Sequence, residues 1–364
     1  MNECDNGVAK RTFPRLRYSL RTLLVLFLLG SLLFRMGFVW HSRSLEQRRI
    51  VQQLITSGGW VKYEFEVDGF KEPRGPAWLR KRLGMDHFNR VARASVPADF
   101  LSLRALPDLE EVELVGGLVL DGQMTLLDDL KRLEALSIRG TRMTENGLLH
   151  LTKHRDLARL DLGSTKLSRV PLGCLAELPE LHDLGLSYTD VDDTMLSQLI
   201  PQLRLTRLSL SGCDVSGKPM VAIGMQSDLV DLNLAFSDVQ DSDLQHLKNL
   251  TALRRLNLAG TEIGDAGFVN LLEKIQLREL NLSQTLVGDA GFQSAKYQLI
   301  TVRVLDVADS QLTDGSIDGL CELTSLEHLN MAGTLTMPGQ MELFSRMPST
   351  TRVQGQYEIR QGAN

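Results

Sequence analysis

Leucine-like residues recur at a fixed spacing through most of the chain. They form triplets at relative positions 0, +3 and +5, and successive triplets lie 24 residues apart, except for one step of 25 between Leu277 and Val302. Such a period is the signature of a repeat protein, in which each copy buries its apolar face against its neighbours. The ten triplets begin at Leu109, Leu133, Leu157, Leu181, Leu205, Leu229, Leu253, Leu277, Val302 and Leu326.

Two polar positions keep the same period. The ninth residue of a copy is Thr, Ser or Cys in nine cases, with Gly117 as the exception. The thirteenth is acidic in seven copies, where a carboxylate can accept the free N–H groups of a helix's first turn. Because the acids share this structural role, none of them is favoured as a catalytic residue. They are Asp121, Glu145, Asp193, Asp241, Asp265, Asp289 and Asp314.

This pattern resembles the leucine-rich repeat, LxxLxLxxN/C, with Thr in place of the usual Asn. The resemblance covers residues 109–348. It extends to 85 if a degenerate copy begins at Met85, where Phe88 is in phase but Arg90 replaces the third apolar residue. It implies an α/β solenoid: a curved parallel sheet on the concave side and short helices on the convex side. The whole chain is similar to bacterial membrane-anchored leucine-rich repeat proteins.

An apolar run precedes the repeats. Residues 22–40 are 19 in number and would form about 28 Å of helix, close to the roughly 30 Å hydrocarbon core of a bilayer. Arg35 lies near the far end of the run, and more basic residues precede the run than follow it. These features predict a single-pass signal-anchor with a cytoplasmic N-terminus and an extracytoplasmic repeat domain. Two alternatives stay open: a cleaved signal peptide, which would give a secreted protein, and a buried helix of a soluble protein.

The pattern divides the chain into six parts. Within the region before the repeats, Val61, Tyr63, Phe65 and Val67 alternate as in a strand, and residues 77–84 read as a second short helix. The predicted parts are a basic cytoplasmic tail (1–21), the transmembrane signal-anchor (22–40), a juxtamembrane helix (41–57), a linker and N-terminal cap (58–84), the repeats (85–348) and a C-terminal tail (349–364).

Composition and motifs give no indication of catalysis or of a cofactor. The net charge of −5 with mixed signs and the 5% of aromatic residues argue against nucleic-acid binding. The four cysteines lack metal-ligand spacing, and His150 and His154 lack the glutamate of an HExxH zinc site. Residues 256–272 join a strand, glycines and a helix as a phosphate loop does, but no Lys follows Gly267, and Asp265 would repel a phosphate. We therefore predict a protein without catalytic, metal-binding, cofactor-binding or nucleotide-binding residues.

Alternation along each strand turns the third, fifth and seventh residues of every copy toward the concave side. The third position forms a charge row with alternating signs, interpreted first as a structural ladder of salt bridges and alternatively as a polar binding stripe. The fifth includes an amide row of Asn233, Asn257 and Asn281, and the seventh is mostly small. Tyr188 and Phe236 occupy the eighth position, where Gly is commonest. The charge row is Arg159, Asp183, Arg207, Asp231, Arg255 and Glu279.

These observations predict a membrane-anchored, non-enzymatic interaction module that holds an unidentified protein or peptide on its concave face. Tyr188, Phe236 and the amide row are the predicted contact residues, because exposed aromatics on a polar surface are common binding hot spots. The alternatives are a structural spacer of the cell envelope without a specific ligand, and a glycan-binding protein or hydrolase that uses the concave acids. A ubiquitin-ligase adaptor is disfavoured, because the apolar run stands where an F-box-like domain would be.

Overall fold

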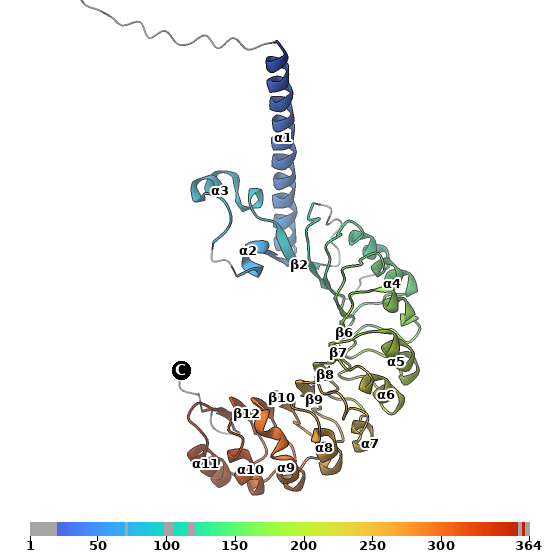
Figure 1. Cartoon of the computed structure of the whole chain (residues 1–364), viewed down its shortest axis with the longest axis vertical. Helices are drawn as coiled ribbons and strands as arrows, with labels where there is room; N and C mark the ends of the chain where they lie inside the picture. The colour runs from blue at the N-terminus through green and yellow to red at the C-terminus, as the bar shows by residue number, and fades with distance from the viewer. Residues whose placement is uncertain are drawn as a thin grey trace, which may run out of the picture.

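The chain forms one long curved sheet lined on its outer side by short helices (Figure 1). The computed structural model describes residues 20–69, 72–97, 103, 105–115, 121–355 and 359–360. Within these residues the sheet has 14 strands, which follow one another in chain order. The strands are β1 (Trp60–Tyr63), β2 (Val91–Pro97), β3 (Glu111–Val115), β4 (Ala135–Ser137), β5 (Arg159–Asp161), β6 (Asp183–Gly185), β7 (Arg207–Ser209), β8 (Asp231–Asn233), β9 (Arg255–Asn257), β10 (Glu279–Asn281), β11 (Val304–Asp306), β12 (His328–Asn330), β13 (Arg352–Gln354) and β14 (Ile359–Arg360).

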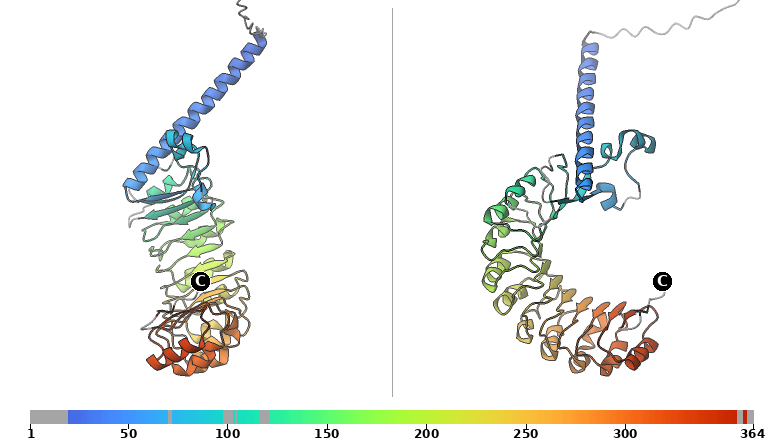
Figure 2. Two further views of the ribbon diagram at one scale, coloured as in Figure 1. Left: turned by 90° about the vertical axis from the view of Figure 1, so that its left-hand side faces the viewer. Right: turned by 180° about the vertical axis from the view of Figure 1, so that it is seen from behind.

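Neighbouring strands from β2 to β13 are parallel, and the first and last pairs, β1 with β2 and β13 with β14, are antiparallel. The outer side carries α-helices and 3-10 helices, and the arc is open toward the concave side (Figure 2). The helices are α1 (Leu20–Thr56), α2 (Glu64–Val67), α3 (Ala77–Leu83), η1 (Met85–His87), η2 (Asp121–Leu126), α4 (Glu145–Leu151), η3 (Leu172–Glu177), α5 (Asp193–Leu199), η4 (Ile200–Gln202), α6 (Lys218–Gly224), α7 (Asp241–Leu244), α8 (Asp265–Leu272), α9 (Asp289–Ala295), η5 (Gln298–Thr301), η6 (Asp314–Ser316), α10 (Ile317–Cys321) and α11 (Met337–Arg346).

The repeated triplets build the core between the sheet and the helices. In the copy from Leu253, the side chains of Leu253, Leu256 and Leu258 are all buried. Leu256 pairs in register with Leu232 on one side and with Leu280 on the other. Because the same leucines stack from copy to copy, one apolar core runs through the whole arc.

The ninth-position hydroxyls close the turn that follows each strand. The hydroxyls of Thr261 and Thr285 donate to the carbonyl oxygens three residues back, those of Leu258 and Leu282, at 2.6 Å in both cases. Both hydroxyl-bearing residues are buried, so each bond satisfies a carbonyl that water cannot reach. Cys213 takes this place in its copy, and its thiol lies 3.0 Å from the carbonyl oxygen of Leu186 in the preceding copy.

The acids at the thirteenth position correct one detail of the sequence prediction. Each begins a helix or 3-10 turn, as expected, but six of the seven, all except Glu145, accept a backbone N–H of the next copy. Asp241 accepts the N–H of Gly264 at 2.7 Å, and Asp265 accepts the N–H of Gly288 at the same distance. Gly264 and Gly288 are the N-cap residues of α8 and α9. The reason is geometric: adjacent helices lie side by side, so the carboxylate of one reaches the backbone in front of the other. We call this contact the carboxylate clamp.

Glycine two residues after the acid makes room for the clamp. A Cβ atom on Gly267 would lie 2.4 Å from the Asp241 carboxylate, and one on Gly291 would lie 2.3 Å from that of Asp265. Real Cβ atoms do not approach other atoms so closely. The Asp-x-Gly order is therefore a packing requirement between copies, which explains the glycine-rich look of residues 256–272.

The apolar run lies in α1, a single helix of 37 residues, without a break between its predicted anchor and juxtamembrane parts. Residues 24–40 expose their large apolar side chains, among them Phe27, Phe34 and Trp40. Within the described residues, α1 alone is long and apolar enough to cross a membrane, and a signal sequence would have the same properties. The predicted cytoplasmic tail is largely outside the described residues.

The C-terminal part of α1 packs onto the cap and the first strands. Val51 and Leu54 are buried there. The predicted strand through Val67 ends early: β1 stops at Tyr63, and α2 follows because Glu66 accepts the backbone N–H of Tyr63 at 2.7 Å. Tyr63 and Phe65 are nevertheless both buried, as their alternation indicated.

The first parallel strand has a different phase from the degenerate copy that the sequence left open. In β2, Ala94 and Val96 pair with Val112 and Leu114, so these two residues occupy the second and third triplet positions. Met85 instead lies in η1 and is 40% exposed. The 24-residue step fails here because the chain between β2 and β3 is shorter than in any later copy.

Candidate binding surface on the concave face

The concave face carries the third-position charges as separate pairs rather than as a continuous ladder. The guanidinium of Arg207 contacts the Asp183 carboxylate at 2.7 Å, and that of Arg255 contacts the Asp231 carboxylate at 2.8 Å. Asp231 raises the pKa of Arg255, chiefly through this hydrogen bond. Both of these pairs join an Arg to the acid of the preceding strand.

Both ends of the charge row depart from the pattern. Arg159 reaches past β4 to the Glu111 carboxylate at 3.5 Å, because Ala135 between them is too small to block the way. Glu111 also contacts Arg93 at 3.2 Å. At the other end the row stops after Glu279, since Val304 of β11 pairs with it in register.

The amide row uses only half of its hydrogen-bonding capacity within the chain. The side-chain oxygens of Asn233, Asn257 and Asn281 accept the backbone N–H two residues on, at 2.9 to 3.1 Å. This bond leaves the Nδ2 groups of the three residues pointing away from their own turns. Nδ2 of Asn330 donates to Asp306 at 3.0 Å, whereas no protein acceptor lies within bonding distance of the other three among the described residues.

A shallow hollow of about 480 Å³ lies over this row. The amide row forms part of its wall, together with Arg255, Glu279 and Asp306. The hollow therefore places three unused amide donors on adjacent strands, about 4.8 Å apart, beside a guanidinium and three carboxylates, those of Asp231, Glu279 and Asp306. Such an array can bind carbonyl oxygens arranged along the row.

Tyr188 and Phe236 lie at the edge of the concave face, just past the strands. Both have positive φ, near 57° and 55°. The corresponding residues of the neighbouring copies, Gly212 and Gly260, also have positive φ, which explains why glycine is common at the eighth position. Each aromatic ring covers the glycine of the next copy: a Cβ on Gly260 would lie 2.4 Å from the Phe236 ring, and one on Gly212 would lie equally close to the Tyr188 ring.

The two rings nevertheless remain about half exposed, Tyr188 by 56% and Phe236 by 51%. Their backbone N–H groups bond to the carbonyl oxygens of Ser211 and Ala259, so both residues are held firmly. The two rings thus alternate with Gly212 and Gly260 along this edge, and each ring packs on the turn of the next copy. They do not line the hollow of the amide row, so the predicted contact residues form two neighbouring groups rather than one site.

A second hollow, also of about 480 Å³, lies over β2 to β7 and was missed by the sequence analysis. Trp60 of β1 stands at its end and is 40% exposed. Arg139, Arg159 and Asp161 line it, with the Arg139 guanidinium 3.1 Å from the Asp161 carboxylate. Trp60 belongs here because β1 pairs with β2 in an antiparallel arrangement, which places Trp60 opposite Ser95. The alternation around Val61 predicted a strand, but no sequence pattern indicated that this strand pairs with the sheet of the repeats.

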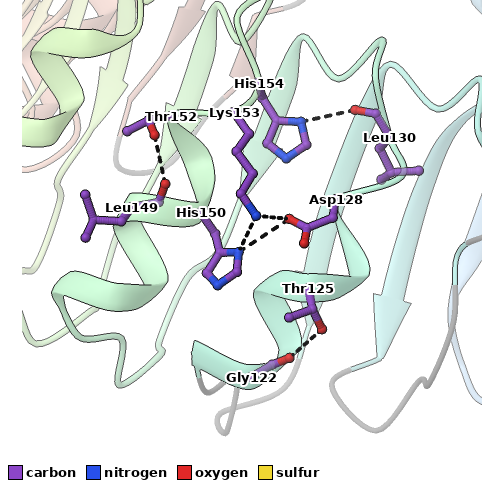
Figure 3. A network of polar contacts seen from close by, with 9 residues as sticks. All are labelled: Gly122, Thr125, Asp128, Leu130, Leu149, His150, Thr152, Lys153 and His154. Atoms are coloured by element: carbon purple, nitrogen blue, oxygen red, sulfur yellow. Dashed lines mark hydrogen bonds and ion pairs between the residues drawn. The ribbon is translucent and has the colours of Figure 1, made fainter.

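His150 and His154 lie on the helix side and do not share a ligand (Figure 3). The helix α4 ends at Leu151, so the two rings are not one helical turn apart. His150 and Lys153 contact the Asp128 carboxylate, at 3.4 and 3.0 Å. Burial opposes the charge of Asp128, but the bonds from Lys153 and His150 lower its pKa below the usual range. His154 is buried beside the Leu130 carbonyl, and burial lowers its pKa. No cluster of three metal-ligating side chains occurs among the described residues.

Solved structures share this architecture. One chain of the yeast Rad7 and Elc1 complex matches 93% of this chain and 98% of its own length, with 16% identity and a TM-score of 0.52. This chain has the leucine-rich repeat fold. Two further matches are an internalin from Listeria monocytogenes (16% identity, 73% of this chain and 87% of that one, TM-score 0.46) and the mouse RP105/MD-1 complex (20% identity, 72% and 50%, TM-score 0.47). The chain thus spans half the length of the matched chain in the mouse complex. No protein-family model and no curated protein matches the sequence.

The leucine-rich repeat resemblance and the α/β solenoid prediction are confirmed at the level of the fold. The identities lie too low to carry more than the fold, so the chemistry of the concave face is argued from this chain's own residues.

Proposed function

We propose that this leucine-rich repeat protein is anchored by α1 in a membrane and binds a protein or peptide partner on its concave face. The observation that carries the proposal is the row of unused Nδ2 donors on the half-buried Asn233, Asn257 and Asn281, which line a hollow. A polypeptide crossing the strands offers carbonyl oxygens along its length, which is the acceptor that three spaced amide donors match.

Aromatic residues supply the anchoring part of this surface. Trp60, Tyr188 and Phe236 are 40 to 56% exposed and have little freedom, because each is held on or beside a strand of the sheet. Rigid, partly exposed aromatics are the residues that most often dominate a protein–protein interface. The charge pairs contribute less, since each Arg is already neutralised by a neighbouring acid.

Support for the anchor comes from α1. Its residues from 24 to 40 expose their large apolar side chains, whereas the described repeat region buries its own in one continuous core. An exposed apolar helix of this length is costly in water and favourable in a bilayer. The topology that follows from the basic N-terminal residues places the repeats outside the cytoplasm.

The test is cross-linking and capture from the native membrane with the full-length chain, comparing wild type with two concave variants. Asn257→Ala removes one amide donor, and Phe236→Gly removes a ring while keeping a residue that tolerates positive φ. Met225→Ala is the matched control, because Met225 is exposed by 70% on the helix side. We expect one partner to be lost at least tenfold from both concave variants and retained by the control.

Equal capture by all four chains would contradict the concave site. Capture of this chain alone would favour the spacer interpretation, in which the solenoid has no specific ligand. Recovery of the chain in the soluble fraction, with α1 removed, would contradict the anchor and leave the concave site as a separate question.

A further inference from the structure

The helix α3 lies beside α1 and stands apart from the solenoid core. Figures 1 and 2 show α3 as the part of the cap that extends along α1 toward its apolar half. Contacts from the segment directly after α3 hold it there. Nε2 of His87 lies 2.9 Å from Nδ1 of His41, and the Trp40 ring is 5.3 Å from the His87 ring. This segment therefore fixes α3 at the level where the exposed apolar part of α1 ends.

No residue of α3 is buried, so core packing does not explain its sequence. Trp78 is 70% exposed, among the highest values of any large apolar residue in the described chain. At this exposure the Trp78 ring contributes little to core packing. Trp is, however, the side chain enriched where a membrane meets water, because its ring is apolar and its N–H is polar.

The charge around Trp78 has one sign. Residues 73–85 contain four basic residues and no acid. Arg80 is used inside the cap, where its guanidinium donates to the Gly75 carbonyl, but Lys81 and Arg82 are exposed and without an ion pair among the described residues. Of the nearby acids, Asp86 accepts the Tyr63 hydroxyl at 2.8 Å and Glu66 accepts a backbone N–H, and Glu72 lies directly before this basic stretch.

We propose that Trp78, Lys81 and Arg82 form a second membrane contact, in which α3 rests on anionic lipid headgroups beside the emerging α1. This inference rests on the proposed anchoring by α1. One helix alone leaves the solenoid free to swing about its base. A second contact beside it fixes the tilt of the arc and hence the direction in which the concave face opens. Each basic side chain near an anionic surface strengthens association about fivefold.

The experiment follows Trp78 fluorescence in the full-length chain reconstituted into vesicles. Trp40→Phe and Trp60→Phe leave Trp78 as the single Trp, because the chain has three. We compare vesicles of phosphatidylcholine with vesicles that also contain phosphatidylglycerol, using neutral acrylamide as the aqueous quencher and brominated lipid as the membrane quencher. Phosphatidylglycerol should lower acrylamide quenching at least twofold and produce quenching by brominated lipid.

Charge reversal provides the matched comparison. Lys81→Glu with Arg82→Glu should abolish the effect of phosphatidylglycerol. Lys248→Glu with Lys274→Glu changes the net charge equally at two exposed residues of the repeats and should leave the effect intact. Hydrogen exchange of residues 76–83 in the wild-type chain gives a readout without Trp substitutions: exchange should slow in phosphatidylglycerol vesicles.

The outcomes separate the two proposals. A chain that does not float with vesicles of either composition contradicts both the anchor and the second contact. A chain that floats, but whose Trp78 is equally open to acrylamide in both lipids, keeps the anchor and overturns the second contact. Protection of Trp78 that is unaffected by the two Glu substitutions overturns the role of anionic headgroups.

Discussion

Two rows of carboxylates have different roles: the helix-side acids recur about every 24 residues, and the concave acids, which alternate with arginines, recur every 48. On the helix side, Asp241 and Asp265 each accept a backbone N–H of the next copy, and the glycine that contacts each carboxylate has no room for a Cβ atom. On the concave face, Asp183 and Asp231 each meet a guanidinium whose side chain is 39% exposed. The first row links neighbouring copies through hydrogen bonds to the backbone. The second row neutralises the positive charge of arginines on the concave face.

The comparison shows that recurrence alone does not define a role. A carboxylate that satisfies an N–H at a helix start stabilises the helix and fixes its distance to the neighbour. A carboxylate paired with an exposed Arg gains little, because water competes for both charges and two long side chains lose freedom. The clamp should therefore be sensitive to any change in shape, and the charge row should be tolerant.

The largest effect is expected from adding a Cβ atom at the glycine that contacts the clamp carboxylate. Gly291→Ala places a Cβ where the Asp265 carboxylate lies, so the two copies must separate or the clamp must break. We expect a loss of about 2–3 kcal/mol of stability, as for other over-packed sites. The measurement is the urea unfolding midpoint of the full-length chain. Gly173→Ala is the control, because a Cβ there meets nothing within 4 Å. Similar midpoints for the two variants would contradict the requirement for glycine beside the clamp.

Removing the clamp carboxylate should cost somewhat less. Asp265→Ala leaves the Gly288 N–H without its acceptor, and we expect a loss of about 1–2 kcal/mol, the usual effect of deleting a helix cap. Asp231→Ala, on the concave face, should lose less than about 1 kcal/mol. Urea titration of both variants in one buffer checks the order. The reverse order would show that the charge row, rather than the clamp, holds the copies together.

How far the sequence predicts this molecule depends on whether a feature lies inside one copy. The buried leucines and the concave positions follow from the period alone, since they depend on alternation within a strand. The partner of Asp265 does not, because every copy repeats the same pattern, and the period does not show whether the carboxylate meets the helix of its own copy or the backbone of the next. The first parallel strand, β2, and the Trp60 hollow were missed for another reason: β1 and β2 lie before the regular period begins, so their register depends on tertiary packing.

At the edge of the concave face, Gly260 has both a positive φ and a close contact with the Phe236 ring. Gly260→Ala adds a Cβ at positive φ and also against the Phe236 ring, whereas Gly140→Ala adds one at a similar φ with nothing within 4 Å. We expect about 1–2 kcal/mol of backbone strain in both variants, and a further loss only at Gly260. Phe236→Ala in the Gly260→Ala background should recover this further loss. Thermal unfolding measures each step. No recovery would mean that the ring does not cover Gly260.

Acid pH should weaken one contact that resembles the clamp. Asp190 accepts the N–H of Ser168 at 2.9 Å and its hydroxyl at 2.8 Å. Burial opposes the charge of Asp190, but the bonds from the Leu167 and Ser168 groups hold its pKa below the usual range. Its contribution is therefore full above the unfolded pKa and disappears as the pH falls through the lower folded pKa. The deficit of Asp190→Asn should be seen at about pH 6 and should vanish near pH 2, measured as the difference in thermal midpoint from wild type. A deficit that stays constant with pH would contradict the ionised contact.

The smallest effect is expected within the charge row itself. A double-mutant cycle on Arg255→Ala and Asp231→Ala should give a coupling of about 0.2–1 kcal/mol that shrinks as salt is added, because both side chains are partly exposed. The same cycle on Arg207 and Asp183 should give a similar value, since the contact has the same geometry one pair along the row. A coupling well above this range that resists salt would mean that the pair is more shielded from water than its exposure suggests. The charge row would then be a structural element of the same rank as the clamp, and the concave face would be less free to exchange its internal pairs for those of a partner.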